Sequence, residues 1–456
     1  MNSQRRGFVE ALRWLALSLL VCCSVSWASD SPPLHTLRLT PSDRILIVAP
    51  HPDDEVIGCG GIIQRAVEMR LPLRVVFLTH GDNNEFSFLL YGKHPVFVPA
   101  AVRRMGEIRH AEALTAAEIL GVSANELIFL GYPDWGTFSI WCSYWGNRPA
   151  YRSMLTRVTT VSYPDAFRPG AEYKGEEILQ DLETILREFH PTKVFVSHPA
   201  DHQPDHRAAY LFTRVALWNA APEVHSEIYP YLVHYHPKWP KPSRDPWNEL
   251  LAPPPSLEEV HWRSFSLLPD QILRKEKALK AHNSQYRAGS AALSAFVRPN
   301  ELFGDFPTGR INPVHPAQIS EDVTEEDRAA FVGLTWQAIS LEGDDLTLSF
   351  RFSRPLAKEV TAFIYLFGYR ADHPFAEMPK VRVNVGMFHT AISDRLGTLK
   401  RAKVQVIRRS KEVALRIPLE LLGDPQRILV SAHTSLGGIP LDRGSWHIVD
   451  LTALKE

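Results

Sequence analysis

The stretch ILIVAPHPDDEVIGCGG at residues 45–61 places a histidine and three consecutive acids directly after an apolar run. Such a short, continuously apolar run is typical of a strand buried on both faces of a parallel sheet. The glycines at 58, 60 and 61 are expected to let the backbone turn sharply into the next helix. Because ligands bind outside the carboxyl ends of parallel strands, we expect the acids to be displayed at a site on the sheet edge rather than buried.

Further strand patterns alternate with helix patterns along the first part of the chain. Strands are predicted at 73–82, 126–136 and 193–198, and helices at 60–69, 102–121 and 176–189. Strands that alternate with helices imply parallel crossover connections. The fold class predicted here is therefore α/β, with a Rossmann-like, doubly wound and mostly parallel sheet within residues 44–305.

The last part of the chain has a different pattern. The segments LTLSFRF at 346–352 and VRVNV at 381–385 alternate apolar and polar residues, and turn residues separate further short strand candidates. Many short strands without intervening helices are typical of an all-β sandwich. We therefore predict a C-terminal β-sandwich-like domain at 325–456, for which carbohydrate binding is one interpretation.

Composition restricts the class of protein. The chain has 456 residues, of which 45% are hydrophobic and 22% charged, which is ordinary for globular domains. Lys plus Arg (50) nearly balances Asp plus Glu (51), so the chain lacks the basic footprint of a nucleic-acid-binding protein.

The first 28 residues resemble an export signal. Arg5 and Arg6 precede an apolar run at 14–25, and Ser26-Trp27-Ala28 offers a small-x-small cleavage site. This pattern predicts an exported protein, periplasmic or secreted. An uncleaved N-terminal anchor is the alternative, and membrane contact is expected only if the segment is retained.

A second polar cluster follows the predicted strand at 193–198. Its ligand-type residues are His198, Asp201, His202, Asp205 and His206. Neighbouring parallel strands would bring this cluster to the same edge as His51 and Asp54. Two imidazoles and a carboxylate from His51, Asp54 and His206 suit Zn²⁺, with a fourth position left for water. Asp53 would then be free to act as general base.

A plainer interpretation exists for each cluster alone. Asp53 or Asp54 could simply cap the following helix. The glycines suggest a dinucleotide loop, but G-x-G-x-x-G is absent and the acids would repel a pyrophosphate. Two clusters of this kind, each after an apolar strand, favour a metal site over both alternatives.

The sequence resembles the PIG-L/LmbE-like family of zinc-dependent N-acetylglucosaminyl de-N-acetylases. The resemblance is carried by APHPDDEVIGCGG at 49–61 and HPADHQPDHRA at 198–208, with weaker support from IRHAEALTAAEILGV, FLGYPD and AHNSQY. It implies one Zn²⁺ per chain, held by His51, Asp54 and His206, and Asp53 as the base. Fe²⁺ or Mn²⁺ could occupy the same ligands.

The resemblance also implies that Arg109 and Asp134 contact the sugar. One departure concerns the residue three positions before the last metal ligand, where many members carry a histidine that helps to stabilise the oxyanion. This chain has Gln203 there, with His202 beside it. Gln203 can donate a hydrogen bond but cannot supply a proton, so His202 is the alternative catalytic partner.

The predicted function is a metal-dependent hydrolase that removes acetyl from N-acetylglucosamine-type groups of an envelope or extracellular glycan or glycoconjugate. Its expected partner is that N-acetylated sugar, with no nucleic acid. Two alternatives stay open: another metallo-amidase or esterase using the same ligands, and a glycan-binding protein whose deacetylase domain is inactive.

Overall fold

The structure, a computed structural model, describes residues 34–83, 98–235, 239–243, 245–308, 331–394, 397–399, 404–437, 439–442 and 444–452. The predicted signal peptide at 1–28 lies outside these residues, as does most of the connection that precedes residue 325. No helix in the described ranges combines the length and the apolar character needed to cross a membrane.

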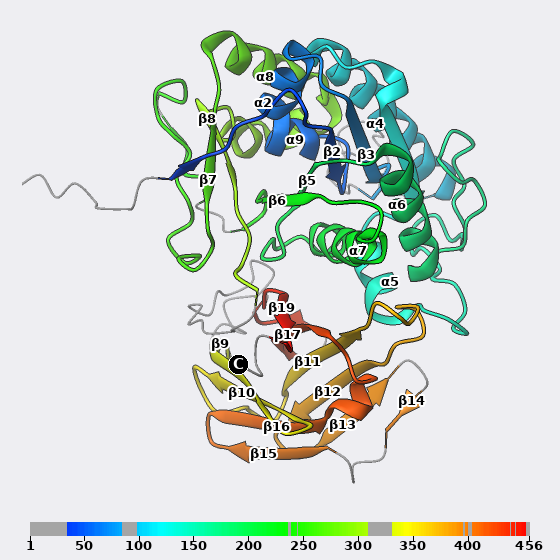
Figure 1. Cartoon of the computed structure of the whole chain (residues 1–456), viewed down its shortest axis with the longest axis vertical. Coiled ribbons are helices and arrows are strands. Elements are labelled where there is room, and N and C mark those ends of the chain that lie inside the picture. Colours follow the sequence, from blue (N-terminus) through cyan, green and yellow to red (C-terminus); the bar gives the residue numbers. More distant parts are fainter. Residues whose placement is uncertain are drawn as a thin grey trace, which may run out of the picture. The chain divides into compact units, whose positions relative to one another are not determined.

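A five-stranded parallel sheet forms the centre of the first part of the chain (Figure 1). Its strands are β2 (Ile45–Ala49), β3 (Leu73–Thr79), β4 (Leu127–Tyr132), β5 (Lys193–Ser197) and β6 (Glu227–Tyr231). Their order is β4-β3-β2-β5-β6, and β2, which is buried along its whole length, pairs with both β3 and β5. The chain runs outward from β2 to one edge and then resumes on its other side, so the switch point, where ligands bind in such sheets, lies between β2 and β5.

Helices lie between these strands in the chain, and two more follow the last of them. They are α2 (Asp54–Glu68), α4 (Pro99–Leu120), η1 (Ala124–Glu126), α5 (Thr137–Ser143), α6 (Gly175–Phe189), α7 (Pro204–Ala220), α8 (Pro269–Ala281) and α9 (Asn283–Ser294). Local signals explain their ends: α4 begins with Pro99 and stops at Gly121, which has a positive φ of 85°. The α/β architecture with a parallel sheet is therefore confirmed.

The glycines after the first acidic motif have a different role from the predicted one. Helix α2 begins at Asp54, so Gly58, Gly60 and Gly61 lie inside it and form no turn before it. A Cβ on Gly58 would lie 2.3 Å from the ring of Tyr231. These positions are small because neighbouring elements pack directly against the helix backbone.

Short strands flank this part of the chain. They are β1 (His35–Thr36), β7 (Arg263–Ser266) and β8 (Asn300–Phe303). β7 and β8 pair antiparallel, and β8 packs against α2. This contact brings residues near 300 beside the helix that follows the first acidic motif.

The C-terminal part consists of two antiparallel sheets. The first has the order β15-β16-β10-β9, with β9 (Leu334–Glu342), β10 (Asp345–Phe352), β15 (Gln405–Arg409) and β16 (Glu412–Pro418). The second has the order β14-β13-β12-β11-β17-β18, with β19 also paired to β17. Its strands are β11 (Val360–Tyr369), β12 (Lys380–Gly386), β13 (Thr390–Asp394), β14 (Gly397–Thr398), β17 (Arg427–Leu436), β18 (Ile439–Pro440) and β19 (His447–Asp450), and η3 (Leu419–Leu422) follows β16.

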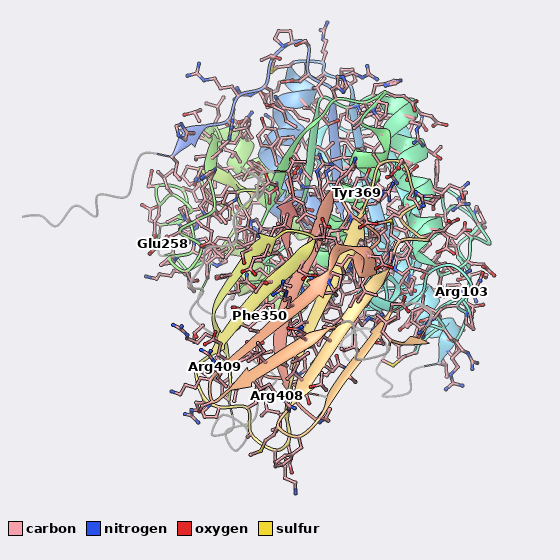
Figure 2. All side chains as sticks on the ribbon, turned by 60° about the horizontal axis from the view of Figure 1, so that its bottom comes forward. Arg103, Glu258, Phe350, Tyr369, Arg408 and Arg409 are labelled. Atoms are coloured by element: carbon pink, nitrogen blue, oxygen red, sulfur yellow. The ribbon has the colours of Figure 1, made fainter. Side chains whose placement is uncertain are left out.

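Alternation along these strands builds one apolar cluster that contains residues of both sheets. Leu348 pairs across the ladder with Leu415, and both are buried in a cluster that includes residues of both sheets. Figure 2 labels the buried Phe350 on β10 and the exposed Arg408 and Arg409 on β15. Burial of each large apolar side chain contributes about 1.5–3 kcal/mol, which explains why the period-2 pattern forms these strands.

A second apolar cluster joins the C-terminal sheets to the α/β part. Trp141 on α5 stacks on Phe375 with ring centroids 5.3 Å apart and meets the edge of Trp446 at 6.1 Å. The backbone N–H of Trp446 donates to the carbonyl of Pro199 at 3.3 Å. Residues from Thr36 onward form one compact unit, and the division into domains at 44–305 and 325–456 stays a prediction.

Candidate active site

Both predicted clusters lie at the carboxyl edge of the parallel sheet. His51 and Asp53 follow β2 directly, and Asp54 opens α2. His206 lies in the first turn of α7, which follows β5. Because β2 and β5 are neighbours, their loops meet at the switch point, as the sequence predicted.

His51, Asp54 and His206 form a compact group with metal-ligand geometry. One ligand atom from each lies within 4.8 Å of the others, and all three residues are buried. Asp54 Oδ2 is 3.2 Å from His51 Nδ1 and 3.1 Å from His206 Nε2. The three ligands proposed from the sequence therefore lie together in the fold.

The chemistry of this group fits a cation. Burial would raise the pKa of Asp54, but the two neighbouring imidazoles hold it well below its usual value. Burial likewise opposes a charge on His206, yet Asp201 and Asp54 raise its pKa to about 10. Among the described residues, neither ring nitrogen of His206 has a well-directed hydrogen-bond partner, although each lies 3.1 Å from a carboxylate. A metal ion would satisfy this accumulation of negative charge and lone pairs.

Two carboxylates from other segments, Asp134 after β4 and Asp205 in the first turn of α7, surround the outer nitrogen of His51. Its Nε2 lies 3.0 Å from Asp134 Oδ1 and 3.4 Å from Asp205 Oδ2. Asp205 is fixed in turn by the backbone N–H groups of Trp135 and Thr137. Asp134 pairs with His51 here, and its expected contact with the sugar stays a prediction. Asp205 joins it as a residue to which the sequence assigned no role.

Asp53 lies beside the ligand group without belonging to it. Its φ of 131° is a strained conformation for a residue with a side chain, worth about 1–3 kcal/mol. Its carboxylate makes no capping bond to α2, contrary to the helix-cap alternative. Burial raises the pKa of Asp53 to about 7, although the Arg109 guanidinium opposes this shift. A carboxyl group with this pKa can both accept and donate a proton near neutral pH.

Arg109 is a buried part of the site, and only 4% of it is exposed. Its guanidinium donates to the carbonyls of Pro52 at 2.7 Å and Gly81 at 2.9 Å, and Nη2 is 3.4 Å from Asp53 Oδ1. A Cβ on Gly81, whose φ is 65°, would lie 2.2 Å from this guanidinium. Arg109 therefore holds the strained loop around Asp53, and contact with the sugar stays a prediction.

Gln203 and His202 occupy different surroundings. The Gln203 side-chain oxygen caps α7 by accepting from the backbone N–H groups of Asp205 and His206, and its Nε2 lies 3.4 Å from His51 Nε2. The ring of His202 packs beside Tyr235 with centroids 5.2 Å apart. Of the two candidates, Gln203 is the one whose side chain the structure directs at His51.

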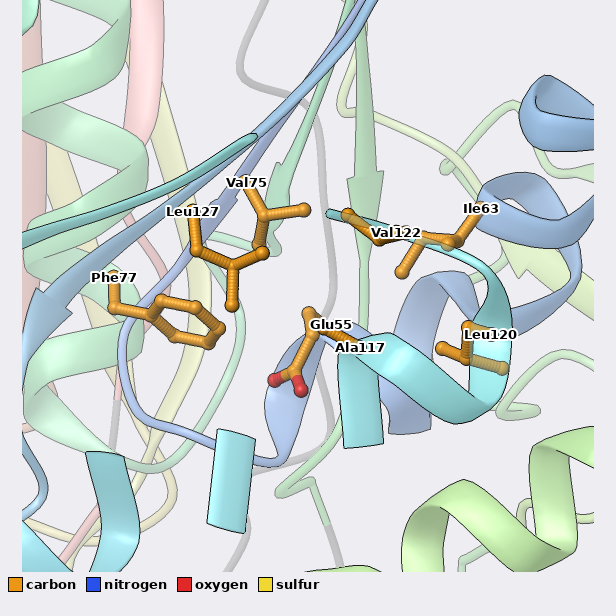
Figure 3. A pocket seen from close by; sticks show the side chains of 8 residues that line it. All are labelled: Glu55, Ile63, Val75, Phe77, Ala117, Leu120, Val122 and Leu127. Atoms are coloured by element: carbon orange, nitrogen blue, oxygen red, sulfur yellow. The ribbon is translucent and has the colours of Figure 1, made fainter. Parts of the chain in front are cut away.

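The buried acids contradict the expectation that they would be displayed to solvent. Asp53 is 8% exposed, Asp54 1% and Glu55 4%. Glu55 Oε2 accepts from the backbone N–H of Asp53 at 2.9 Å, and Oε1 lies 3.0 Å from His282 Nε2. Figure 3 shows the Glu55 carboxylate at a narrow cavity that is otherwise lined by apolar side chains such as Val75. Glu55 and His282 thus support Asp53 from behind, which only the tertiary structure reveals.

His234 is a further residue that sequence reasoning left without a role. It follows β6, and its ring centroid lies 4.8 Å from that of His206. Asp201 holds both: it accepts from the His234 backbone N–H at 3.0 Å and lies 3.1 Å from His206 Nδ1. The only signal in the sequence was a polar segment after an apolar strand.

Solved structures resemble part of the chain. N,N'-diacetylchitobiose deacetylase from Pyrococcus horikoshii is 21% identical and covers 57% of this chain and 82% of its own, with a TM-score of 0.37. The conserved protein TT1542 from Thermus thermophilus is 25% identical and covers 56% of this chain and 84% of its own, with a TM-score of 0.33.

Comparison with known sequences identifies the segment that carries the site geometry. The chain is 29% identical to 1D-myo-inositol 2-acetamido-2-deoxy-alpha-D-glucopyranoside deacetylase 1 of Saccharopolyspora erythraea, over 40% of this chain and 55% of that protein. A deacetylase of Kineococcus radiotolerans named for the same substrate is 31% identical, over 43% of this chain and 51% of that protein. The chain spans about half the length of these curated relatives. Residues 46–217 match the model of the PIG-L family, described as GlcNAc-PI de-N-acetylase, and this part of the chain is therefore a PIG-L family domain.

Proposed function

We propose that this protein is a zinc-dependent N-deacetylase that hydrolyses the acetamide of N-acetylglucosamine-type sugars. The observation that carries the proposal is the buried group of His51, Asp54 and His206 with Asp53 beside it. The family match and the deacetylase relatives support the reaction class. Hydrolysis adds water across the amide and releases acetate and the free amine.

His51 Nδ1, Asp54 Oδ2 and His206 Nε2 would hold the ion. When bound, Zn²⁺ acts as a Lewis acid toward the acetamide carbonyl and acidifies water to near neutral pKa. The same two-nitrogen, one-oxygen set would accept Fe²⁺ or Mn²⁺. Asp134 and Asp205, at the other nitrogen of His51, orient this ring and raise its basicity.

Asp53 takes the role of general base. It removes a proton from the attacking water and later returns that proton to the departing amine nitrogen. Arg109 fixes its loop through the carbonyls of Pro52 and Gly81, and Glu55 accepts from its backbone N–H. This support holds the carboxylate in one position, which is what proton transfer in a positioned complex requires.

Gln203 and His234 are the proposed donors to the tetrahedral oxyanion. Gln203 Nε2 faces His51, and the His234 ring lies beside His206. Donors aimed at the charge that develops in the transition state are worth about 10²–10³ in rate. In this arrangement His234 supplies the imidazole that position 203 lacks, and His202 packs beside Tyr235.

The remaining parts of the proposal concern architecture and location. The strand order with its switch point between β2 and β5 supports a Rossmann-like, doubly wound sheet. The apolar core common to both C-terminal sheets supports a β-sandwich at 325–456, which would favour longer glycans. We place the protein outside the cytoplasm because of residues 1–28, and the substrate is then an envelope or extracellular glycan or glycoconjugate.

The test is an acetate-release assay on N-acetylglucosamine oligomers and glycolipids, with and without a chelator. Acetate should be released, the chelator should abolish release, and added Zn²⁺ should restore it. His206→Ala should lose both activity and metal, whereas His225→Gln, at an exposed position, should retain both. Hydrolysis of a peptide or ester panel without acetate release from the sugars would support another metallohydrolase instead.

A further inference from the structure

A second histidine in the interior of the protein lacks the partners that a buried imidazole needs. His80 follows β3 directly, is 1% exposed, and neither of its ring nitrogens has a hydrogen-bond partner among the described residues. An imidazole always carries at least one N–H, and a buried donor without an acceptor costs about 1–3 kcal/mol. Unsatisfied groups of this kind often mark a bound water or ion.

Aromatic packing fixes the plane of the His80 ring. It stacks on Tyr163 with centroids 3.7 Å apart and an interplanar angle of 7°, and Phe129 lies 5.3 Å away. Tyr163 is itself held by a 2.7 Å hydrogen bond from its hydroxyl to Asp82. This packing holds the His80 ring in one plane and fixes the directions in which its two nitrogens point.

Two further ligand-type residues lie beside this ring. One ligand atom each from His80, His110 and Asp165 lies within 4.8 Å of the others. His110, on α4, has its Nδ1 2.8 Å from Asp165 Oδ2, and these side chains are 23% and 44% exposed. The group thus has a buried end at His80 and an open end through which an ion could enter.

We propose that His80, His110 and Asp165 bind a second divalent transition-metal ion of the Zn²⁺ type. Two imidazoles and one carboxylate are a donor set that Zn²⁺ accepts, and the exposed side leaves a position for water. A cation would satisfy the His80 ring, which no group in the described part of the chain does. To admit the ion, His110 and Asp165 would have to move slightly apart, because they now contact each other directly. Both lie at the exposed end of the group.

The second ion would have a structural role and no direct role in a reaction. It would join the end of β3, helix α4 and the loop that carries Asp165. His80 and His110 are the direct chain neighbours of Gly81 and Arg109, which hydrogen-bond to each other at 2.9 Å. None of its ligands belongs to the group of His51, Asp54 and His206, so this inference does not depend on the proposed function.

Metal stoichiometry tests the proposal directly. Purified protein is stripped with a chelator, refilled with Zn²⁺, passed through a desalting column and measured by plasma mass spectrometry. The wild-type chain should retain about two ions, and Asp165→Asn and His110→Gln should each retain about one. Loss of a ligand should weaken binding by at least the roughly 10–100-fold typical of an outer partner. Asp344→Asn and His225→Gln, both exposed and remote in sequence, should retain two.

His206→Ala separates the two sites. If both exist, this variant retains one ion, and the double variant with Asp165→Asn retains none. Co²⁺ in place of Zn²⁺ should give an absorption spectrum that loses one component in Asp165→Asn and a different one in His206→Ala. A wild-type chain that holds a single ion, or Asp165→Asn and His110→Gln variants that hold as much as the wild type, would overturn the second site and leave the first one standing.

Discussion

The edge of the parallel sheet and the core of the C-terminal sheets are built on opposite principles. The edge buries charged groups, among them Asp53, Asp54 and His206, and holds Asp53 in a strained backbone conformation. The C-terminal core alternates apolar side chains that meet across two sheets. Backbone strain at the edge lowers the free energy of unfolding, whereas burial of apolar side chains in the C-terminal core raises it. Variants in the two regions should therefore fail in different assays.

The largest expected effect is on catalysis without loss of fold or metal. Asp53→Asn should lower the acetate-release rate about 10²–10⁴-fold, the usual worth of a positioned general base. Its metal content should stay at the wild-type level, because Asp53 is not in the ligand group. Asp54→Asn is the matched neighbour and should lose the ion. Loss of metal in Asp53→Asn would mean that the roles of the two aspartates are exchanged.

The next-largest effect is expected at the apolar contact between the α/β part and the C-terminal sheets. Trp446 is 1% exposed and packs against Trp141 and Phe367. Trp446→Ala should lower the free energy of unfolding by about 3–5 kcal/mol through lost packing and a cavity. Urea denaturation measures this loss, and the exposed Trp247→Ala should change it by less than about 0.5 kcal/mol. Equal stability of both variants would show that the two regions are energetically independent.

Two lysine–glutamate pairs at different depths test how burial changes the cost of losing one partner. Lys275 and Glu301 are 1% and 2% exposed and 2.6 Å apart, and Glu301 also accepts from the backbone N–H of Gly61 in α2. Glu301→Gln leaves the lysine charge buried and should cost about 3–5 kcal/mol. Lys193 and Glu227 lie 2.8 Å apart with side chains 12% and 64% exposed, and Glu227→Gln should cost about 0–1 kcal/mol. Comparable costs in urea denaturation would contradict the role of burial.

A further prediction is a pH dependence within the C-terminal sheets. His433 stacks on Phe363 and Tyr365, and burial, aided by Arg207, lowers its pKa to about 3. Below about pH 6.5 the unfolded chain binds a proton that the folded chain rejects, so the free energy of unfolding falls as pH falls toward 3. The slope should be at most about 1.4 kcal/mol per pH unit, and less because the ring is partly exposed.

His433→Phe isolates this contribution. The variant keeps the stacking and removes the titrating group, so its stability should vary less between pH 6.5 and 4 than that of the wild type. His225→Gln, which changes an exposed histidine, should keep the wild-type slope. An unchanged slope in His433→Phe would assign the acid sensitivity to other groups.

Local patterns made much of the fold and of the first ligand group predictable. An apolar run followed by polar residues gives a strand end, and spacing of three residues puts His51 and Asp54 on one turn, where Asp54 Oδ2 reaches Nδ1 at 3.2 Å. Alternation predicted the C-terminal strands, since period 2 is a property of the strand itself. The pairing of β2 with β5, which brings His206 to the neighbouring strand end, comes from the topology of the sheet.

The remaining partners depend on contacts between elements that are distant in sequence. His282 meets Glu55 across 227 positions, and Asp205 meets His51 across 154. Nothing in the local pattern marks such pairs, because each forms only when two separately determined elements pack together. For the same reason the contact of Asp134 with His51 was not predicted.

By itself, the sequence predicted the parallel sheet from its periodicity, and its two polar motifs indicated the PIG-L family and the candidate metal ligands. Only the tertiary structure decided the burial of Asp53 and Glu55, the positions of Arg109 and His234, and the apolar contact through Trp446. Burial and charge environment are sums over neighbours from many segments. They set the pKa of Asp53 at about 7, and no single stretch of sequence contains them.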